Sequence, residues 1–318
     1  MEKPYVIGMD MGGTNTVFGV VDARGNVISK SAIKTGTHTD VNVYIQDLYD
    51  ELIKLIDAAG GADKFKGIGV GAPNGNYYTG NIEFAPNLPW KGVIEFAKLM
   101  TAKFGIPTAL TNDANAAAFG EMTYGAAHGM KNFIMITLGT GVGSGIIIDG
   151  KVLYGHDGFA GELGHTTAIR NNGRLCGCGK SGCLETYCSA TGVARSAREI
   201  LESSTKDSLL RNIPLESITS KDVFDAAMEG DEVAKEIFNF TGKILGESLA
   251  DFVAFSAPEA IVIFGGLSKA GDLIMNPIRE NMEKNLLPLW KGKIKLMFSD
   301  LKEADAAVLG ASALAWEL

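Results

Sequence analysis

Short apolar runs separated by glycine-rich turns open the chain. Val6–Asp10 and Val17–Val21 have the length and the β-propensity typical of strands, and Gly12-Gly13-Thr14 lies between them. Asn26–Thr35 follows as a third strand. The pattern predicts a β-hairpin that continues into a sheet.

Helical and strand periodicity then alternate. Apolar residues between Ile45 and Ile56 recur at helical spacing, with Asp40 as the expected N-cap and Gly60-Gly61 as the stop. The other elements expected here are strand Gly67–Gly71, helix Lys91–Phe104, strand Pro107–Thr111 and helix Ala114–Tyr124. This half therefore reads β-β-β-α-β-α-β-α.

The second half repeats that order with a long glycine-rich insertion. Gly12 and Asp22 have the counterparts Gly139 and Asp149, so the same spacing follows each turn. The elements expected in this half are three strands between Phe133 and Leu153, helices Ala190–Leu201, Lys221–Glu229 and Glu232–Ser256, strand Ala260–Phe264, helix Lys269–Lys284, strand Ile294–Phe298 and helix Ala304–Trp316. The chain thus predicts two related halves.

The two Gly/Thr turns are candidate phosphate cradles. Glycine lets backbone N–H groups approach a ligand closely, and threonine adds a hydroxyl donor. Either turn alone is also typical of an ordinary hairpin, but two copies favour turns that face one anionic chain. Asp10 suits a group that holds Mg²⁺ through water. Gly265-Gly266 lies at a strand–helix junction, which is either a ligand site or a plain tight turn.

All four cysteines lie between Cys176 and Cys188. Cys176, Cys178 and Cys183 are surrounded by glycines, which permit a loop that wraps one ion. A tetrahedral zinc site needs a fourth ligand, for which His165 is the first candidate and Cys188 the rival. A closed site of this kind is structural. Reduced thiols or a local disulfide are the alternative.

Five polar residues are candidates for chemistry. Asp113 begins a helix after a strand, where it is either an N-cap or a base that accepts a proton from a hydroxyl attacking phosphorus. Asn112 offers a donor and an acceptor to a polyol. Glu162 and Glu185 bracket the cysteines, and Asn87 lies in a proline-flanked loop. Each of these three alone is typical of a surface or turn residue, but together they suit sugar hydroxyls.

Length and charge exclude several classes of protein. The 318 residues suffice for two domains with cores, and a net charge of −8 without a basic run disfavours nucleic-acid binding. The apolar runs are too short for a signal peptide or a membrane span. We therefore expect a cytoplasmic protein without a membrane partner.

Three motifs together resemble the ROK family (repressors, open reading frames and kinases), and in particular its bacterial glucokinases. They are Asp10-Met11-Gly12-Gly13-Thr14, Gly161-Glu162-Leu163-Gly164-His165 and the segment from Cys176 to Glu185. The resemblance covers essentially the whole chain. It implies an α/β, two-lobed, actin-like ATPase fold, with duplicated ribonuclease-H-like cores and an interlobe active-site cleft. The implied lobes are 1–113 with about 304–318, and 114–303 with the zinc loop 165–183.

The resemblance also implies an activity and roles for residues. The activity is ATP-dependent phosphorylation of the 6-hydroxyl of glucose, with Mg²⁺, a structural Zn²⁺ and a homodimer or homotetramer. Asp113 is then the catalytic base, and the residues that bind the sugar are Asn87, Asn112, Glu162, His165 and Glu185. The residues that hold Mg-ATP are Asp10, Gly12, Gly13, Thr14, Asn15, Gly139, Thr140, Gly141, Gly265 and Gly266. The zinc ligands are His165, Cys176, Cys178 and Cys183.

Other activities stay open within the resemblance. Gly71–Tyr78 departs from the usual family pattern near the expected sugar site, which leaves N-acetylmannosamine, N-acetylglucosamine, mannose or fructose as alternative substrates. Polyphosphate is an alternative donor. A transcriptional repressor with an N-terminal helix-turn-helix domain is disfavoured, because the first strand begins by Tyr5 and the chain is acidic. A sugar-responsive regulator without a DNA-binding domain is the less favoured alternative to a kinase. Asp10 and Asp113 speak against a catalytically silent sugar-binding scaffold.

Overall fold

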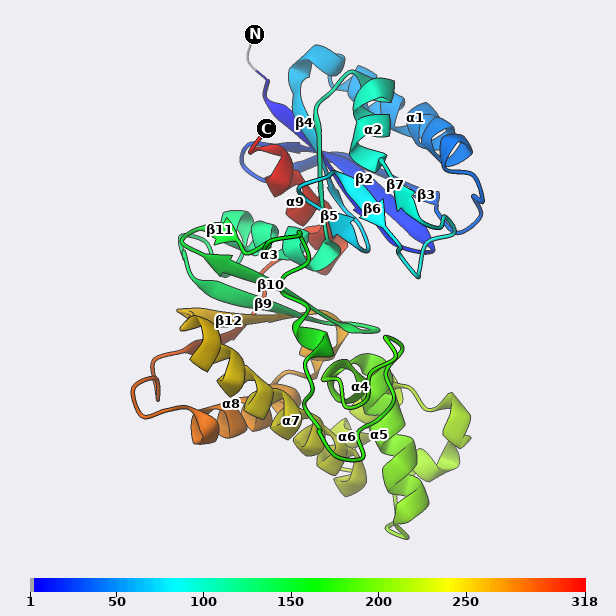
Figure 1. Ribbon diagram of the computed structural model, residues 1–318. Coiled ribbons are helices and arrows are strands. Elements are labelled where there is room, and N and C mark those ends of the chain that lie inside the picture. Colours follow the sequence, from blue (N-terminus) through cyan, green and yellow to red (C-terminus); the bar gives the residue numbers. More distant parts are fainter. Residues whose placement is uncertain (1–2) are drawn as a thin grey trace. The chain divides into compact units, whose positions relative to one another are not determined.

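The computed structural model describes residues 3–318 and divides into two compact units. The first unit contains residues up to Lys131, Gly145–Gly161 and Ser299–Leu318. The second contains Asn132–Ser144 and Glu162–Phe298. Figure 1 labels the elements along the chain.

A five-stranded sheet forms the centre of the first unit, with the order β3-β2-β1-β4-β8. β1 is antiparallel to β2 and parallel to β4, β2 is antiparallel to β3, and β4 is parallel to β8. The bounds are Tyr5–Met11 for β1, Asn15–Asp22 for β2, Val27–Lys34 for β3, Phe65–Gly71 for β4 and Thr108–Thr111 for β8. The hairpin and the following strands are thereby confirmed.

Helices α1 (Val41–Ala58) and α2 (Phe96–Phe104) contribute to the main core of this unit. The Asp40 side chain accepts a hydrogen bond from the Asn42 N–H, which confirms the expected cap. The expected start of the second helix at Lys91 is wrong, because Gly92 has φ +81° and the following residues pair as a strand. The short elements here are η1 (Ala62–Lys64), β5 (Gly75–Asn76), β6 (Asn81–Glu83) and β7 (Val93–Ile94), and the last three form a small sheet in the order β5-β6-β7.

Helices α3 (Asp113–Tyr124) and α9 (Glu303–Ala315) pack together, and α9 also packs on β1 and β4. Glycines allow this close packing. A Cβ atom on Gly8 of β1 would lie 2.0 Å from the Val308 carbonyl oxygen, and one on Gly69 of β4 would lie 1.9 Å from the Ala311 carbonyl oxygen. The C-terminal helix therefore belongs to the first unit, next to the strands that begin the chain.

A second five-stranded sheet has the order β11-β10-β9-β12-β13. This repeats the first sheet, because in both the third, second, first, fourth and fifth strands follow one another across the sheet. β12 is parallel to β9 and to β13, as β4 is to β1 and β8. The bounds are Phe133–Leu138 for β9, Val142–Ile148 for β10, Lys151–Val152 for β11, Ala260–Phe264 for β12 and Lys295–Phe298 for β13. The duplicated actin-like core is confirmed.

Helices make up most of the rest of the second unit, where α7 packs on α8. The expected helix from Lys269 begins later than predicted, because Gly271 has φ +56° and separates a 3-10 turn from α8. The bounds are Glu185–Cys188 for α4, Ala190–Ser203 for α5, Ser220–Met228 for α6, Glu232–Ser256 for α7, Asp272–Asn285 for α8, Leu163–His165 for η2, Leu209–Asn212 for η3, Leu215–Ser217 for η4 and Gly266–Ala270 for η5.

The compact units differ from the expected lobes 1–113 with about 304–318 and 114–303. Both α3 and the segment Gly145–Gly161 group with the first unit. The functional lobe limits stay a prediction. Within residues 3–318, none of the helices combines the length and the apolar character that crossing a membrane requires.

Candidate functional site

The first Gly/Thr turn joins β1 to β2. The Gly12 N–H donates to the Asn15 carbonyl at 2.9 Å, and the N–H of Thr35 donates to the Thr14 carbonyl at 2.9 Å. A Cβ atom on Gly13 would lie 2.4 Å from the carbonyl oxygen of Asn87. Only glycine therefore fits at this point, and the loop carrying the exposed Asn87 lies directly against the turn.

Three buried hydroxyls follow this turn. The Oγ1 of Thr16 lies 2.8 Å from that of Thr35 and 2.6 Å from the Tyr44 hydroxyl. All three side chains are fully buried, and burial raises the pKa of Tyr44 above its ordinary value. The first turn is therefore anchored to β3 and α1 by a neutral hydroxyl network, which we call the hydroxyl triad.

Two carboxylates lie beside the first turn. Asp10 is the penultimate residue of β1 and Asp113 begins α3, and a Cβ atom on Gly71 would lie near both residues. Burial, together with the charge of Asp113, raises the pKa of Asp10 to about 6. Asp113 is accessible to solvent yet densely surrounded by protein, and this desolvation raises its pKa too. A carboxylate with a raised pKa is a better proton acceptor.

Asn112, rather than Asp113, is the N-cap of α3. Its Oδ1 accepts hydrogen bonds from the N–H groups of Ala114 at 2.8 Å and Asn115 at 3.3 Å. The interpretation of Asp113 as the N-cap is therefore wrong, although its own Oδ1 also accepts from the Ala114 N–H at 2.8 Å. The second oxygen of Asp113 has no hydrogen bond within residues 3–318.

The second Gly/Thr turn joins β9 to β10. The Gly139 N–H donates to the Gly141 carbonyl at 3.1 Å, and the Val142 N–H donates to Oε2 of Glu185 at 3.0 Å. A Cβ atom on Gly141 would lie 2.4 Å from the same carboxylate oxygen. Glu185, expected only as a sugar ligand, is therefore also part of the support of this turn.

Gly265-Gly266 lies beside the second turn because β12 and β9 are parallel neighbours that end together. Phe264 pairs with Thr137, and a Cβ atom on Gly265 would lie 2.6 Å from the Leu138 carbonyl oxygen. Gly265 has φ +103°, which also favours glycine. The second unit therefore brings these two predicted nucleotide-binding segments together.

The segment 165–183, which we call the Cys loop, contains a cluster of four residues. Ligand atoms of His165, Cys176, Cys178 and Cys183 all lie within 4.8 Å of one another. The Sγ atoms of Cys178 and Cys183 are 3.6 Å apart, and Cys176 Sγ lies 3.7 Å from His165 Nδ1. Tetrahedral zinc with Zn–S bonds of about 2.3 Å places sulfur atoms about 3.8 Å apart, so the donor set fits this ion.

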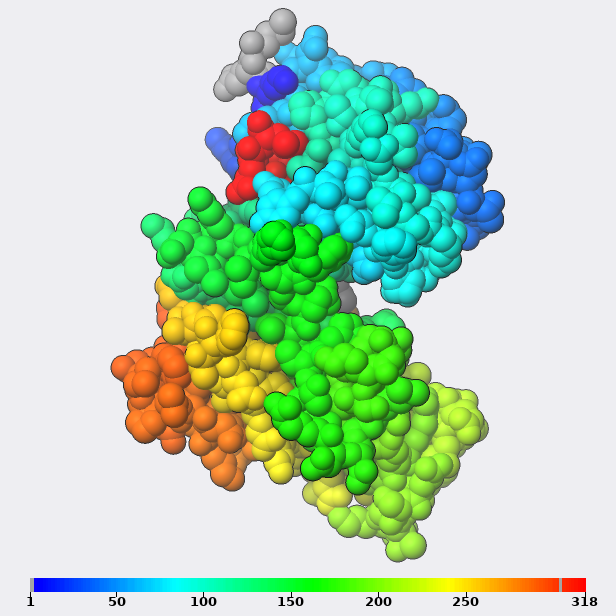
Figure 2. All heavy atoms as spheres, viewed as in Figure 1, coloured from blue at the N-terminus to red at the C-terminus, as the bar shows by residue number. Residues whose placement is uncertain are grey.

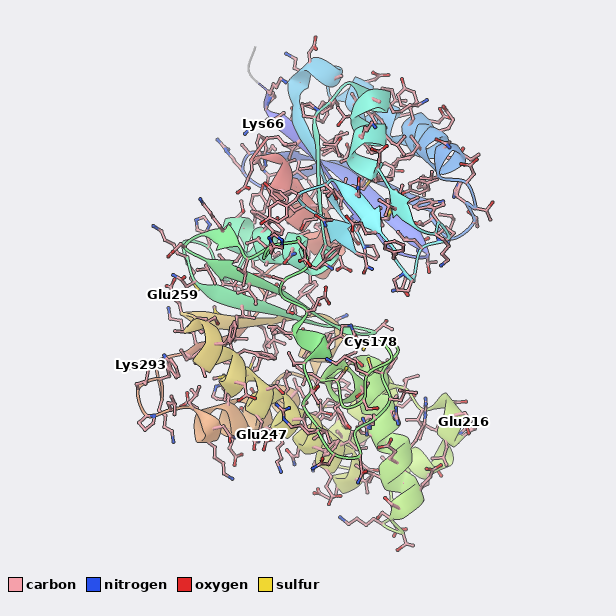
Figure 3. The ribbon with its side chains drawn as sticks, viewed as in Figure 1. Lys66, Cys178, Glu216, Glu247, Glu259 and Lys293 are labelled. Atoms are coloured by element: carbon pink, nitrogen blue, oxygen red, sulfur yellow. The ribbon has the colours of Figure 1, made fainter. Side chains whose placement is uncertain are left out.

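Cys188, the rival fourth ligand, lies outside the cluster. It is fully buried, and its thiol donates to the Thr241 carbonyl at 3.7 Å. The Cys loop lies at the surface of the second unit, in green in Figure 2, and Figure 3 labels its exposed Cys178. The structure thus favours His165 over Cys188 as the fourth member of the set.

η2 places Glu162 and His165 next to β10. A Cβ atom on Gly164 would lie 2.0 Å from the Val142 carbonyl oxygen, and the Leu163 N–H donates to Ser144 Oγ at 3.1 Å. Glu162 is exposed, while Oε1 of Glu185 lies 3.8 Å from Cys176 Sγ. The second unit therefore gathers Glu162, His165 and Glu185 around the Cys loop and the second turn.

Residues 6–317 match the ROK family. The chain belongs to the ROK family. A glucokinase of Halalkalibacterium halodurans is 38% identical over 316 residues, which are 98% of this chain and 94% of that protein. A xylose repressor of Caldicellulosiruptor bescii is 30% identical over 97% of this chain and 77% of its own length. The crystal structure of a ROK family glucokinase from Streptomyces griseus in complex with glucose and AMPPNP matches with a TM-score of 0.81 at 32% identity, over 99% of this chain and 100% of that one.

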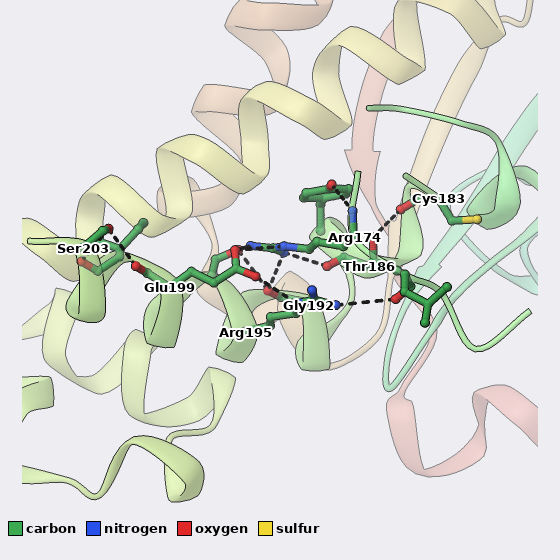
Figure 4. Close-up of polar contacts among 11 residues, drawn as sticks. Arg174, Cys183, Thr186, Gly192, Arg195, Glu199 and Ser203 are labelled. Atoms are coloured by element: carbon green, nitrogen blue, oxygen red, sulfur yellow. Dashed lines mark hydrogen bonds and ion pairs between the residues drawn. The ribbon is translucent and has the colours of Figure 1, made fainter. Parts of the chain in front are cut away.

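Arg174 is a residue of this ROK chain that sequence reasoning missed. It belongs to the Cys loop, is only 7% exposed and lies over the Tyr187 ring with its guanidinium carbon 4.4 Å from the centroid. Its N–H groups donate to Glu199, Ser196 and the carbonyls of Thr186 and Gly192, as Figure 4 shows. A buried cation with every donor used fixes the loop to α4 and α5.

The signal for Arg174 in the sequence is weak. An arginine in a glycine-rich loop is typical of an exposed side chain. Its acceptors are main-chain oxygens and side chains of a separate helix, which no motif reveals. By contrast, the predicted site residues of the ROK chain fall into two sets. The first unit holds Asp10, Gly12, Gly13, Thr14, Asn15, Asn87, Asn112 and Asp113, and the second holds Gly139, Thr140, Gly141, Glu162, His165, Cys176, Cys178, Cys183, Glu185, Gly265 and Gly266.

Proposed function

We propose that this chain is an ATP-dependent hexokinase of the glucokinase type, which transfers the γ-phosphoryl group of Mg-ATP to the 6-hydroxyl of glucose. The observation that carries the proposal is the pair Asp10 and Asp113 beside the first Gly/Thr turn. The identity to a curated glucokinase and the likeness to a glucokinase in complex with glucose and AMPPNP support it.

Asp113 is the proposed catalytic base. The raised pKa of its carboxyl suits acceptance of a proton from the sugar hydroxyl as that oxygen attacks phosphorus. The Oδ2 atom is the candidate acceptor, because Oδ1 already binds the Ala114 N–H. The attack breaks the bond between the γ-phosphorus and the bridging oxygen, and ADP leaves with that oxygen.

The two glycine turns are the proposed phosphate sites. Gly12–Asn15 and Gly139–Gly141 present backbone N–H groups, and Gly265-Gly266 is the proposed contact with the nucleoside. Asp10 is the residue that would hold Mg²⁺, because hard cations take oxygen ligands such as carboxylates. When bound, Mg²⁺ neutralises charge on the transferred phosphate.

Five side chains are the proposed sugar ligands. Asn87 and Asn112 come from the first unit, and Glu162, His165 and Glu185 come from the second. The Oδ1 of Asn112 already accepts the hydrogen bonds of the α3 cap, so its amide nitrogen is the group we assign to the sugar. Since Nδ1 of His165 faces Cys176, the Nε2 atom is the one we assign to a sugar hydroxyl.

A structural zinc ion is the proposed occupant of the Cys loop. Its ligands are His165, Cys176, Cys178 and Cys183, whose spacing supports a closed tetrahedral site. Zinc bound there would order the loop that carries His165, and phosphoryl transfer would be left to the other proposed residues. We also expect a cytoplasmic homodimer or homotetramer, which light scattering coupled to size-exclusion chromatography checks.

The first test is a coupled ADP-release assay with Mg-ATP on glucose, mannose, fructose, N-acetylglucosamine and N-acetylmannosamine. Turnover greatest on glucose is the expected result, and a greater rate on another sugar would correct the substrate but keep the reaction. Polyphosphate in place of ATP tests the donor. Saturable glucose binding by calorimetry without turnover on any sugar or donor would overturn the kinase proposal in favour of a sugar-responsive regulator.

A further inference from the structure

The first residues of α5 bind two successive carbonyl groups of the second turn. The Ala190 N–H donates to the Gly139 carbonyl at 2.8 Å, and Thr191 Oγ1 donates to the Thr140 carbonyl at 2.9 Å. Both peptide groups of the turn therefore have their oxygens directed at the start of α5.

A trans peptide group points its N–H opposite to its C=O. The carbonyl of Gly139 shares a peptide plane with the N–H of Thr140, and the carbonyl of Thr140 shares one with the N–H of Gly141. Fixing both carbonyls on α5 therefore turns both N–H groups to the opposite side. Two successive N–H groups on one side form an anion-binding concavity.

The remaining N–H groups of the turn have other partners. The Gly139 N–H binds the Gly141 carbonyl, and the Val142 N–H binds Glu185. Across residues 3–318, no protein acceptor is found for the N–H of Thr140 or Gly141. These two are thus the donors that the turn keeps for a phosphate.

The Thr191 hydroxyl is itself held in place. Its Oγ1 lies 2.9 Å from Ser189 Oγ, which accepts from the Gly192 N–H as the N-cap of α5 and shares its single proton between Thr191 Oγ1 and the Glu185 carbonyl at 2.7 Å. Arg174 adds hydrogen bonds to the carbonyls of Thr186 and Gly192 on either side of the α4–α5 junction. The junction is therefore a fixed platform for the turn.

We infer that Thr191 is a positioning residue for nucleotide binding, because its hydroxyl holds the Thr140 carbonyl and so aims the Gly141 N–H at the phosphate. This inference rests on the proposed function. Thr191 touches no reacting atom in this scheme. Its effect belongs to the binding of Mg-ATP and Mg-ADP, not to the binding of hexose or to proton transfer.

Thr191→Val tests the inference, because valine keeps the shape of the side chain and removes the hydroxyl. The expected result is a rise of about fivefold in the KM for Mg-ATP and in the Kd for Mg-ADP, since one hydrogen bond is lost. The KM for glucose and kcat stay within about twofold of the unmodified protein. Thr191→Ser keeps the hydroxyl and restores the values of the unmodified protein.

Thr101→Val is the matched control, because Thr101 is an exposed helical threonine in α2 with no side-chain hydrogen bond inside the described chain. It should leave every constant unchanged. An unchanged Mg-ATP KM in Thr191→Val, or an equal rise in the KM for glucose, would overturn the inference. So would failure of Thr191→Ser to restore binding.

Calorimetry with Mg-ADP and no sugar separates the two proposals. If the protein phosphorylates no sugar but Thr191→Val still weakens Mg-ADP, the positioning inference stands and the kinase proposal fails. If glucose is phosphorylated and Thr191→Val binds Mg-ADP normally, the kinase proposal stands and the positioning inference fails. A protein that neither binds Mg-ADP nor turns over overturns both.

Discussion

The two Gly/Thr turns occupy equivalent places in two sheets of the same strand order, yet they are supported in different ways. The first turn is anchored by the hydroxyl triad of Thr16, Thr35 and Tyr44, which is fully buried. The second is held from α4 and α5 by Glu185 and Thr191. Among the residues that the structure describes, the second turn alone has a hydrogen bond to a residue that also approaches the Cys loop.

This difference suggests how a duplicated core came to perform two tasks. The strand order and the turn are the same in both halves, which fits the proposal that each turn presents N–H groups to phosphate. Within the first unit, Asp10 and Asp113 lie beside the first turn, which fits their proposed parts in proton transfer and Mg²⁺ binding. Within the second unit, the Cys loop lies near the second turn, which fits its proposed part in positioning the sugar. Changes to one turn should therefore leave the other intact.

Asp113→Asn should give the largest effect, because it removes the proton acceptor without removing shape. We expect kcat to fall by about 10²- to 10⁴-fold. Steady-state assays with glucose and Mg-ATP measure the loss, and calorimetry should find glucose and Mg-ADP bound within a few-fold of normal. Asp57→Asn, an exposed carboxylate of α1, serves as the control. Near-normal turnover in Asp113→Asn would show that this residue is not the catalytic base. The acids beside the first turn would then no longer mark a functional difference between the two turns.

Asp10→Asn should change how stability depends on pH. Burial and the charge of Asp113 raise the pKa of Asp10 from 3.8 to about 6. Because the folded protein holds this proton more tightly than the unfolded chain, stability falls as pH rises from about 4 to about 6. Above that range the ionised carboxylate costs about 3 kcal/mol. Asp10→Asn should recover much of this lost free energy of unfolding at pH 8 without Mg²⁺.

Urea unfolding at pH 4, 6 and 8 measures this effect as the difference between the variant and the unmodified protein. Added Mg²⁺ should stabilise the unmodified protein at pH 8 but not Asp10→Asn. Asp57→Asn should follow the unmodified protein at every pH. A difference that does not change between pH 4 and pH 8 would refute the assignment of this titration to Asp10.

Cys183→Ser should disturb only the second turn. It removes one member of a four-residue set whose ligand atoms lie within 4.8 Å, so bound zinc should fall from about one per chain to near zero. The Kd for glucose should rise about 10- to 100-fold, because the loop carrying His165 loses its order. Hydrogen exchange should quicken in peptides covering 139–142 and stay unchanged in those covering 12–16.

Cys188→Ser provides the matched control for the metal. Cys188 lies in the same unit, but its thiol donates to the Thr241 carbonyl and lies outside the cluster of ligand atoms. It should keep its zinc, its affinity for glucose and its exchange pattern. If Cys183→Ser retained zinc, or if its 12–16 peptides exchanged as fast as the 139–142 peptides, the separate support of the two turns would be wrong.

Much of this arrangement follows from local sequence patterns. The hairpins, the Asp40 cap and the His165–Cys183 cluster are readable because apolar periodicity, cap chemistry and ligand spacing are short-range signals. The predicted helix starts at Lys91 and Lys269 come too early because they too rest on short-range patterns, which do not register Gly92 and Gly271. Each lies in or beside an otherwise helical pattern, and only the backbone reveals that its positive φ delays the helix.

The hydrogen bonds that support the two turns could not be predicted from the sequence. They join residues far apart in the chain through side chains of ordinary types. Tyr44 has the spacing of an ordinary apolar helix position, and nothing local indicates that its hydroxyl meets Thr16. Thr191 and Arg174 bind main-chain carbonyls, which carry no residue-specific signal. The sequence thus indicates candidate ligand-facing groups, but it does not reveal the side chains that support the two turns.

Tyr44→Phe should give the smallest effect and tests the first support directly. It removes the hydroxyl that lies 2.6 Å from Thr16 Oγ1, while Thr16 and Thr35 keep their own 2.8 Å contact. Because one donor or acceptor of the network is lost, the free energy of unfolding should fall by about 1 kcal/mol. Urea unfolding at pH 7 measures the change.

Tyr49→Phe is the matched control, since Tyr49 lies on the same helix and its hydroxyl has no hydrogen bond in the described part of the chain. It should leave stability unchanged. The contrast with Thr191→Val is the informative result. Loss of a buried hydroxyl behind the first turn should cost stability with little change in nucleotide binding, whereas loss of an exposed hydroxyl behind the second should weaken nucleotide binding at little cost in stability. Equal losses of stability in the two variants would mean that both turns depend on their hydroxyls in the same way, and the proposed difference between the supports of the two turns would fail.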